Sequence, residues 1–430
     1  MIEKVVSYIK NKADMYEVYF SDSNLLNIEG ESMKPNFVSE GTTKALALRV
    51  VVDKKIGVAS TLNINNYKEC VNNAIKIAKF NNVDKDFKNF AFPDKYKRII
   101  NFSKSLVNFG SEDFIKLNKD IVNEVTNLNK NIEFVKIIYY KNMNNRRIIN
   151  SNGIDVEDKT VDNSFVYTLR LGGEAIDLYD SDVSILTTKN VGETVERLES
   201  LFNKQKIKNA RVPVMLHQNA LSTFLDHTFT FNIDAENVQK GKSLFKNMVG
   251  KKIADKNVNI CDDGIKKGLI NSRSFDDEGV PSKKTDIIKD GVLKGFLYDV
   301  YTANKENRKS TGNAVRGLNF IPKIKTNNLV FGKGNKTKEQ LIDSIDKGLY
   351  IISTMGGHTM NESTGDFSLV VSEGHYIENG KIKYPVKDVM ISGNFYDMLN
   401  KIECIGKEIK HYDDGYYLPL ILFSEVNVIC

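Results

Sequence analysis

The sequence predicts an α+β fold, with a mixed α/β N-terminal part followed by a strand-rich C-terminal domain with β-hairpins. Early in the chain, segments with apolar residues at helical spacing mix with segments that alternate every second residue. From Ala210 onward, short apolar runs are separated by turn residues. Two of these turns contain Asp290-Gly291 and Asn379-Gly380, dipeptides that favour tight hairpins. No glycine fingerprint of a Rossmann or P-loop fold is present.

The length of 430 residues exceeds what one hydrophobic core usually supports, so two or three domains are expected. Polar, basic and irregular sequence at Phe87–Ser103 and Lys204–Asn209 indicates the boundaries. We therefore expect an N-terminal α/β segment at residues 1–90, a middle helix-and-strand segment at residues 105–205 and a C-terminal domain at residues 210–430.

Periodicity places the elements of the first two segments. The N-terminal segment is predicted to contain an amphipathic helix at its start, a strand at Lys44–Asp53 and a helix at Tyr67–Phe80. The elements predicted for the middle segment are a helix from about Ser111, strands at Glu133–Tyr140 and Ser164–Leu171, and a closing helix with Val195, Leu198 and Phe202 on one face.

The C-terminal domain carries turn and cap signals of a more local kind. Hairpins are predicted at Ile287–Leu297 and at Tyr376–Ile382, each centred on its Asp-Gly or Asn-Gly pair. Thr337 and Gln340 form the pattern of a capping box, which predicts the start of a helix, and Gly348 supplies the stop.

Composition argues against several classes of protein. The net charge is +6, but 61 basic residues are interleaved with 55 acidic ones, and no basic cluster alternates with aromatics as a nucleic-acid groove requires. The four cysteines are scattered without a CxxC pair, which argues against a zinc ribbon or a disulfide framework. No apolar stretch is long enough to cross a bilayer, and no secretion signal is recognisable. We expect a soluble, cytoplasmic protein with no nucleic-acid or membrane partner.

Several phrases in the second half are too specific to be turn chemistry alone. They are Ser274–Val280 (SFDDEGV), Ser310–Asn313 (STGN), Asn361–Ser368 (NESTGDFS), Ile377–Lys381 (IENGK), Tyr384–Val386 (YPV) and Ile391–Asn394 (ISGN). In order and spacing these phrases resemble the TldD/PmbA family, whose members were once described as modulators of DNA gyrase and are better understood as peptidases. The likeness is closest to the PmbA or TldE branch.

The resemblance implies a cytosolic dimeric particle that handles flexible peptides. TldD-type members have a helix with HExxxH, which supplies two zinc ligands and a general base, and a later cysteine is a further ligand. A TldD subunit can pair with a TldE subunit that lacks the metal site. The partner expected here is accordingly a TldD-type catalytic subunit or a second copy of the chain, together with a peptide substrate.

The expected zinc motif is degenerate in this chain. His217 occupies the first ligand position, but Gln218 replaces the glutamate and Ser222 the second histidine. Glutamine cannot take a proton from a bound water, and a neutral hydroxyl is a poor zinc ligand. On a helix, His227 would lie about 15 Å from His217, too far to share one ion. No thiol occurs within His411–Pro419, where the later cysteine is expected. No cofactor is therefore expected; zinc is the alternative, with His217 as its remaining candidate ligand.

An acidic triplet and three loop residues are the candidates for lining a peptide cleft. The triplet could share acid and base work, but it precedes Gly279 and Pro281, so a turn-shaping or substrate-lining role is preferred. His358 and His375 form a possible second pair of metal ligands. The cleft candidates are Asp276, Asp277, Glu278, Thr311, Asn313 and Asp366.

Three functions follow from these observations. The preferred hypothesis is a non-catalytic PmbA/TldE-like subunit that helps bind and process flexible peptides. The second is an autonomous metallopeptidase with a non-standard metal site. The third, a protein associated with DNA or gyrase, rests only on the older description of the family.

Overall fold

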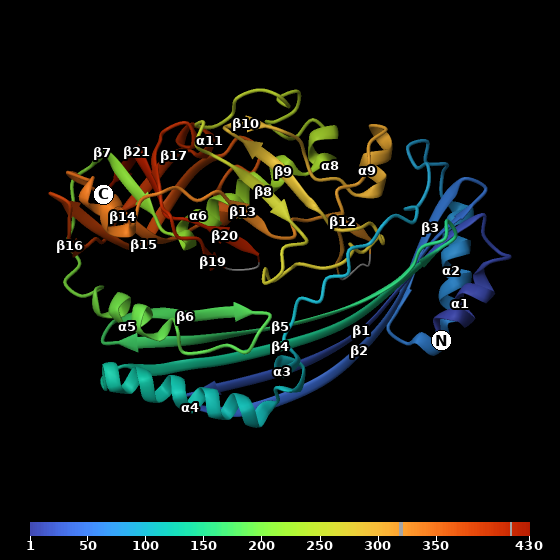
Figure 1. Cartoon of the computed structure of the whole chain (residues 1–430), viewed down its shortest axis with the longest axis horizontal. Helices are drawn as coiled ribbons and strands as arrows, with labels where there is room; N and C mark the ends of the chain where they lie inside the picture. The colour runs from blue at the N-terminus through green and yellow to red at the C-terminus, as the bar shows by residue number, and fades with distance from the viewer. Residues whose placement is uncertain (318–320, 413–414) are drawn as a thin grey trace.

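The computed structural model describes residues 1–317, 321–412 and 415–430. A long, curved sheet forms one layer, and the C-terminal domain lies over its concave face (Figure 1). The chain passes from the sheet to the C-terminal domain after α5 (Val191–Glu199).

The N-terminal sheet contains six antiparallel strands in the order β3-β2-β1-β4-β5-β6. Its central pair joins distant parts of the sequence, with Glu17 of β1 opposite Asn150 of β4. Strands of residues 1–90 and of residues 105–205 therefore share one sheet. The strands are β1 (Met15–Glu31), β2 (Lys34–Val52), β3 (Lys55–Thr61), β4 (Glu133–Asn150), β5 (Asp155–Leu171) and β6 (Glu174–Asp182).

The three strands predicted in this region exist, but each is only part of a longer strand. The stretch Lys44–Asp53 corresponds to the end of β2, whose earlier residues are mostly exposed, including Phe37 and Val38. In β4, the polar run Lys141–Arg147 extends the strand predicted at Glu133–Tyr140. Backbone pairing with β1 and β5 holds this run, so it shows no apolar alternation.

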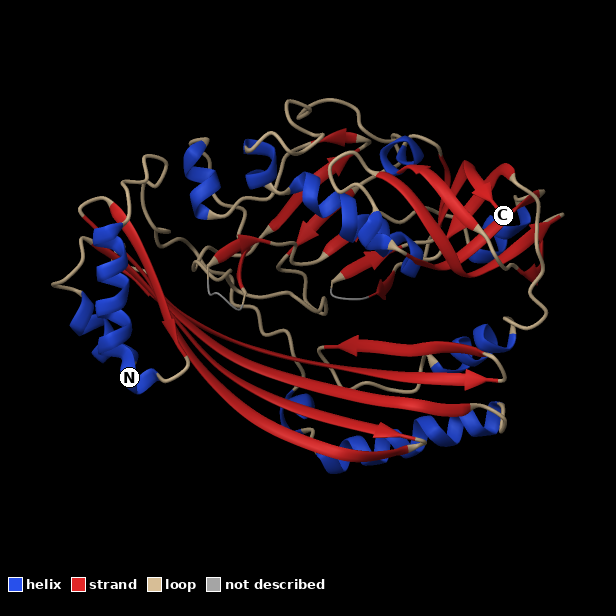
Figure 2. Cartoon of the chain, turned by 180° about the vertical axis from the view of Figure 1, so that it is seen from behind, coloured by secondary structure: helices blue, strands red, loops and turns tan. Residues whose placement is uncertain are grey.

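Helices cover one end and the convex face of the sheet (Figures 1 and 2). On the convex face, α4 buries Phe114 and Val125. In α5, Val195 and Leu198 are buried as predicted, whereas Phe202 lies beyond the helix and is 39% exposed, so its placement on this face was wrong. These helices are α1 (Ile2–Ile9), α2 (Tyr67–Phe80), α3 (Lys104–Asn108), α4 (Ser111–Leu128) and α5.

Two larger sheets build the C-terminal domain. In the first, five strands close on themselves, because β14 pairs with β7 and β15, β21 with β7 and β17, and β17 with β15. It comprises β7 (Ala210–Leu216), β14 (Lys347–Met355), β15 (Asp366–Glu378), β16 (Lys381–Pro385), β17 (Met390–Asn394), β18 (Ile402–Ile405) and β21 (Ile421–Ile429). The second comprises β8 (Ile260–Asp263), β9 (Lys284–Lys289), β10 (Val292–Leu293), β13 (Leu329–Phe331), β19 (Lys410–Tyr412) and β20 (Tyr416–Leu418).

Smaller elements complete the domain. A short ribbon pairs β11 (Ala314–Arg316) with β12 (Pro322–Ile324). The helices are α6 (Gln218–Phe224), a π-helical turn (Leu225–Phe229), α7 (Thr230–Ile233), α8 (Ala235–Gln239), α9 (Val300–Lys305), α10 (Lys338–Asp343) and α11 (Phe395–Leu399).

Local turn chemistry predicted the hairpins and the N-terminal cap correctly, but Gly348 as the helix stop was wrong, because α10 ends at Asp343 and Gly348 lies in β14. β9 pairs with β10 and β15 with β16. Asp290 and Gly291 have φ values of 52° and 73°, the left-handed conformation that the hairpin turn requires. The capping box of α10 is present, since Gln340 N donates to Thr337 Oγ1 at 3.2 Å and Thr337 N to Gln340 Oε1 at 3.0 Å.

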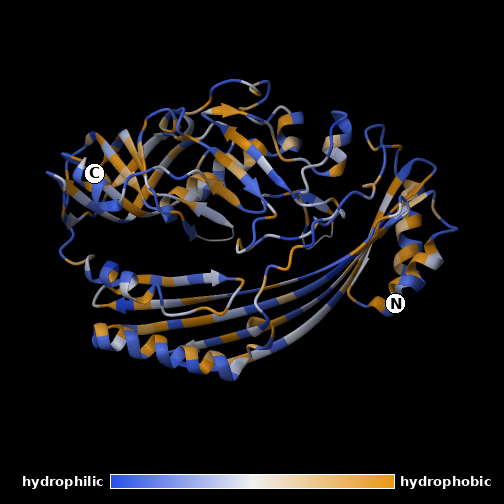
Figure 3. Ribbon diagram, viewed as in Figure 1, coloured by the Kyte–Doolittle hydropathy of each residue, from blue (hydrophilic) through white to orange (hydrophobic). Residues whose placement is uncertain are grey.

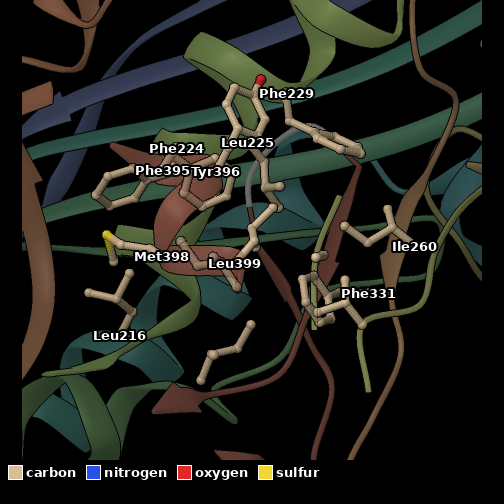
Figure 4. Packing of buried hydrophobic residues seen from close by; sticks show 14 of the residues in the cluster. Leu216, Phe224, Leu225, Phe229, Ile260, Phe331, Phe395, Tyr396, Met398 and Leu399 are labelled. Carbon is tan, nitrogen blue, oxygen red and sulfur yellow. The ribbon is translucent and has the colours of Figure 1, made fainter. Parts of the chain in front are cut away.

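The main apolar core of the C-terminal domain packs around α6 and α11 (Figure 4). Phe224, fully buried on α6, stacks on Phe395 with ring centroids 5.3 Å apart. Phe367 of β15 meets Phe224 edge-on at 4.8 Å. This packing fixes the helix whose first turn carries the candidate metal motif.

Polar and apolar residues are interleaved along the elements (Figure 3). The longest of the described helices, α4, has 18 residues and alternates charged with apolar side chains. Within the described ranges, no helix is both long and apolar enough to cross a membrane.

Replacing Phe224 by alanine should lower the free energy of unfolding by about 3–5 kcal/mol, because a fully buried aromatic side chain leaves a cavity. Urea unfolding of the full chain measures this loss. Phe80, at 79% exposure, is the matched control, and its replacement by alanine should change stability by less than about 0.5 kcal/mol. Equal losses for the two variants would contradict the packing described here.

Candidate functional site

The degenerate motif begins at the junction of β7 and α6. His217 caps the helix: its Nδ1 accepts a hydrogen bond from Asn219 N at 3.2 Å, and its own N–H donates to Ile351 O at 2.8 Å. The side chain is 6% exposed, so His217 is a buried residue at the start of the helix. Because Nδ1 acts as an acceptor, the ring proton lies on Nε2, and neither nitrogen has a free lone pair for a metal.

The other two motif positions offer no better ligand. Ser222 Oγ donates to Asn219 O at 2.8 Å, a bond within the helix. Gln218 is buried, and its Oε1 lacks a hydrogen-bond partner among the described residues. Among residues 1–317, 321–412 and 415–430, no group of three His, Cys, Asp or Glu side chains could hold a metal ion.

A cavity of about 280 Å³ lies beside this helix start. Arg197 and Lys410 line it with His217, and burial together with Arg197, Lys410 and Lys338 holds the pKa of His217 well below its ordinary value. Arg197 donates two parallel hydrogen bonds to Glu373, from Nε to Oε1 at 2.8 Å and from Nη2 to Oε2 at 2.6 Å. With Nδ1 of His217 used by the cap, Gln218 and Ser222 at the other motif positions, and no group of three ligating side chains within the described ranges, the residues present do not supply the donor set of a zinc ion.

His411 lines the same cavity as His217, which the sequence did not predict. Its Nδ1 lies 3.2 Å from Ser181 O, and its ring stacks on Tyr417 at 4.7 Å. Its position in the sequence could have indicated it, because His411 begins the segment His411–Pro419, where the later cysteine ligand of the family is expected. Residues 413 and 414 of that stretch lie outside the described residues.

A second, larger cavity of about 890 Å³ lies between the concave face of the N-terminal sheet and the C-terminal domain. Side chains of β1, β2, β4 and β5 form one wall, and loops of the C-terminal domain form the other. The polar lining includes Tyr19, Ser21, Ser23, Thr43, Asn144, Arg146, Thr160, Asp162, Asn271, Arg273, Asp277, Arg316, Lys325 and Asn327.

The acidic triplet lies at this interface and is buried. Asp276 shapes the turn, since its Oδ1 accepts from Glu278 N at 2.9 Å and Val280 N at 3.0 Å, and Gly279 has a φ of 77°. Of the triplet, Asp277 lines the large cavity. The turn-shaping interpretation therefore describes Asp276, while its two neighbours form ion pairs.

Arginines from the N-terminal sheet and the C-terminal domain bind the other two carboxylates. Asp277 Oδ1 accepts from Arg146 at 2.7 Å and from Arg273 at 3.1 Å. Burial would raise the pKa of Asp277, but Arg273 and Arg146 outweigh it, so the pKa lies below its ordinary value. Glu278 accepts from Arg49 at 2.7 Å, and burial raises its pKa.

Glu17 of β1 extends this set of ion pairs. It accepts two bonds from Arg49, at 2.9 and 2.7 Å, and forms an ion pair with Arg316. We call Glu17, Arg49, Arg146, Arg273, Asp277, Glu278 and Arg316 the interdomain ion-pair network.

The three loop candidates occupy separate places. Thr311 Oγ1 accepts from Tyr298 N at 2.7 Å, and Asn313 donates to Asp262 at 2.7 Å, so both stabilise loops. Asp366 is exposed and accepts from Thr364 at 2.6 Å. Within the described part of the chain, none of these three residues lines the large cavity.

His358 and His375, the possible second pair of metal ligands, belong to no group of three ligating side chains within the described residues. His358 is exposed, whereas His375 is buried with its Nε2 2.9 Å from Ser200 Oγ.

Replacing His217 by asparagine should flatten the dependence of stability on pH between 6.5 and 5. Folded His217 resists protonation, whereas the unfolded chain takes up the proton near the ordinary pKa of 6.5, so the wild type loses stability as pH falls through this window. Asparagine retains a cap but does not titrate. Urea unfolding measures the free energy of unfolding at pH 7.5 and 5.5. Its drop between these two pH values should be smaller in the variant than in the wild type by about 1 kcal/mol.

The matched control is His358→Asn at an exposed position, which should keep the pH dependence of the wild type. An unchanged pH dependence in His217→Asn would show that this imidazole is not held neutral by its surroundings.

Replacing Asp277 by asparagine should destabilise the chain by about 3–5 kcal/mol, because Arg146 and Arg273 lose the buried carboxylate that they share. Asp366→Asn, at an exposed loop carboxylate, should cost less than about 1 kcal/mol. Thermal unfolding compares the two variants. A similarly small loss for both would mean that the network does not hold the two layers together.

Comparison with known proteins identifies the family. Residues 209–430 match the family described as "PmbA/TldA metallopeptidase C-terminal domain", and residues 16–78 match "PmbA/TldA metallopeptidase domain 1". A protein of Methanocaldococcus jannaschii described as uncharacterized is 30% identical over 416 residues, covering 95% of this chain and 97% of its own. A metalloprotease of the same organism is 25% identical, covering 95% and 92%.

The structure of TldE from Thermococcus kodakarensis superposes on this one with a TM-score of 0.93, at 24% identity and complete coverage of both chains. This likeness concerns the fold. With the family matches over 209–430 and 16–78, the chain belongs to the PmbA/TldD metallopeptidase family and has a TldE-like structure.

Proposed function

We propose that this chain is a non-catalytic, TldE-like subunit that binds flexible peptides and assists their cleavage by a TldD-type catalytic partner in the cytoplasm. The observation that carries the proposal is the state of the motif helix. His217 uses Nδ1 to cap the helix, and Ser222 uses its hydroxyl within the helix. Gln218 has no carboxylate to act as a base for water.

The charge around the helix start supports the same proposal. Metal-assisted hydrolysis needs a site that attracts a divalent cation and at least three protein ligands. Here burial, together with Arg197 and Lys410 in the cavity lining, lowers the pKa of His217. Glu373 and Glu193 bind these two cations, so neither carboxylate is available to a metal.

The larger cavity supports peptide binding. Its volume of about 890 Å³ lies in the range of ligand sites. Hydroxyl and amide side chains such as Ser21, Thr160 and Asn271 line it and can pair with the backbone of an extended peptide. A binding role needs such a surface but no catalytic base.

One observation favours the alternative of an autonomous metallopeptidase with a non-standard site. His217 and His411 line one cavity, together with Asp180. A rearrangement that freed both imidazoles would provide two nitrogen ligands and a carboxylate. Elemental analysis of protein purified without added metal separates the two functions: near-stoichiometric zinc supports the alternative, and zinc-free protein supports the non-catalytic subunit.

The cleavage experiment tests the proposal directly. The purified chain alone should not cleave an unfolded, fluorescently labelled peptide, whereas a mixture with the TldD-type chain of the same organism should cleave it faster than that chain alone. A chelator should abolish the activity of the mixture, because the metal belongs to the partner. Chelator-sensitive cleavage by this chain alone would overturn the proposal.

A further inference from the structure

One arginine in the wall of the large cavity has an unused side. Arg146 of β4 lines the cavity and is 7% exposed. Its Nη1 donates to Asp277 Oδ1 at 2.7 Å. The Nε and Nη2 atoms are buried and have no hydrogen-bond partner among the residues that the structure describes. Buried donors are almost always paired, so an orphaned pair on a cavity wall calls for an explanation.

The same two atoms bind carboxylates elsewhere in this protein. The Nε–H and Nη2–H bonds of a guanidinium are parallel and match the two oxygens of one carboxylate. Three arginines make this side-on pair: Arg49 with Glu17 at 2.9 and 2.7 Å, Arg147 with Asp155 at 2.9 and 3.0 Å, and Arg197 with Glu373 at 2.8 and 2.6 Å. In Arg146 the equivalent side has no carboxylate from residues 1–317, 321–412 or 415–430.

Charge in the wall also favours an anion. Arg146 and Arg273 share the carboxylate of Asp277, so neither guanidinium has this carboxylate to itself. Asp158, opposite Arg146 on β5, accepts from Ser274 N at 2.9 Å. Asp162 lines the cavity together with Asp277, and it accepts a hydrogen bond from the side-chain amide of Asn142 on β4.

We propose that the large cavity binds a carboxylate of a peptide, held side-on by Arg146 Nε and Nη2. The inference rests on the proposed peptide-binding function and adds the group that the site recognises. Because both nitrogens are buried, the Arg146 side chain turns toward the cavity as the carboxylate binds. The source is the C-terminal carboxylate of the peptide or an acidic side chain, which present the same planar group.

Isothermal titration of the full chain with four peptides tests the inference. The probes are N-acetyl-tetraalanine as free acid and as C-terminal amide, and the amide of N-acetyl-Ala-Glu-Ala-Ala with its glutamine counterpart. If the bound group is the C-terminal carboxylate, the free acid should bind at least about tenfold more tightly than its amide. A side-chain carboxylate predicts the same preference for the glutamate peptide over the glutamine peptide.

Two variants and one control assign the preference to Arg146. Arg146→Lys keeps the charge but loses the parallel donors, and Arg146→Gln removes the charge while Asp277 keeps Arg273. Both should abolish the preference. Arg147→Lys changes the neighbouring residue of β4, whose side-on edge is already bound to Asp155, and should retain it. Thermal unfolding checks that each variant folds.

Equal binding of the charged and uncharged probes by the wild type would overturn this inference while leaving peptide binding, and thus the proposed function, in place. Retention of the preference in a folded Arg146 variant would also overturn it. Failure of every probe to bind would overturn both the inference and the peptide-binding part of the proposed function.

Discussion

The interdomain ion-pair network is the constraint on which the rest of this structure depends. Arg49 of β2 binds Glu17 of β1 and Glu278 of the C-terminal domain, so one guanidinium joins two sheet strands to the opposite layer. Arg146 and Arg273 approach the next carboxylate from opposite layers. Intact buried pairs add little net stability compared with apolar contacts, but a misplaced layer would leave several charges unpaired. We therefore interpret the network as fixing how the C-terminal domain sits on the sheet.

This constraint also defines the large cavity. Polar side chains of β1, β4 and β5 face the C-terminal domain, and the network closes the space beside them. Hydroxyls, amides and guanidiniums share this wall with apolar side chains such as Leu62 and Val315, and the polar groups can pair with the hydrogen-bonding groups of an extended chain. The apolar cores lie elsewhere, around α6 and α11 and beneath the convex face of the sheet. These apolar cores are thus separate from the cavity, whereas Arg146 and Asp277 of the interdomain ion-pair network both line it and join the two layers.

Sequence reasoning succeeded where chemistry is local. The turn at Asp290-Gly291 and the cap at Thr337 depend on residues that are neighbours in sequence. It failed where partners are distant: the pairing of Glu17 with Asn150 joins segments that no periodicity connects. The acidic triplet was recognised, yet its burial depends on arginines such as Arg49, 229 positions from Glu278. Polar strands such as the second half of β4 carry no alternation, so their length could not be predicted either.

The candidate metal site shows why a single matching residue is poor evidence for a ligand. His217 stands at the first position of the family motif, but its Nδ1 serves the first turn of α6 and its ring lies 6.2 Å from that of Tyr350. These contacts are sufficient reason for a histidine here without any metal. A zinc ligand needs a free lone pair and companion ligands at the correct distance, and the Nδ1 lone pair of His217 is already used by the helix cap. The neighbouring motif positions carry an amide at Gln218 and a hydroxyl at Ser222 that is bonded within the helix, so they add neither a general base nor a good ligand.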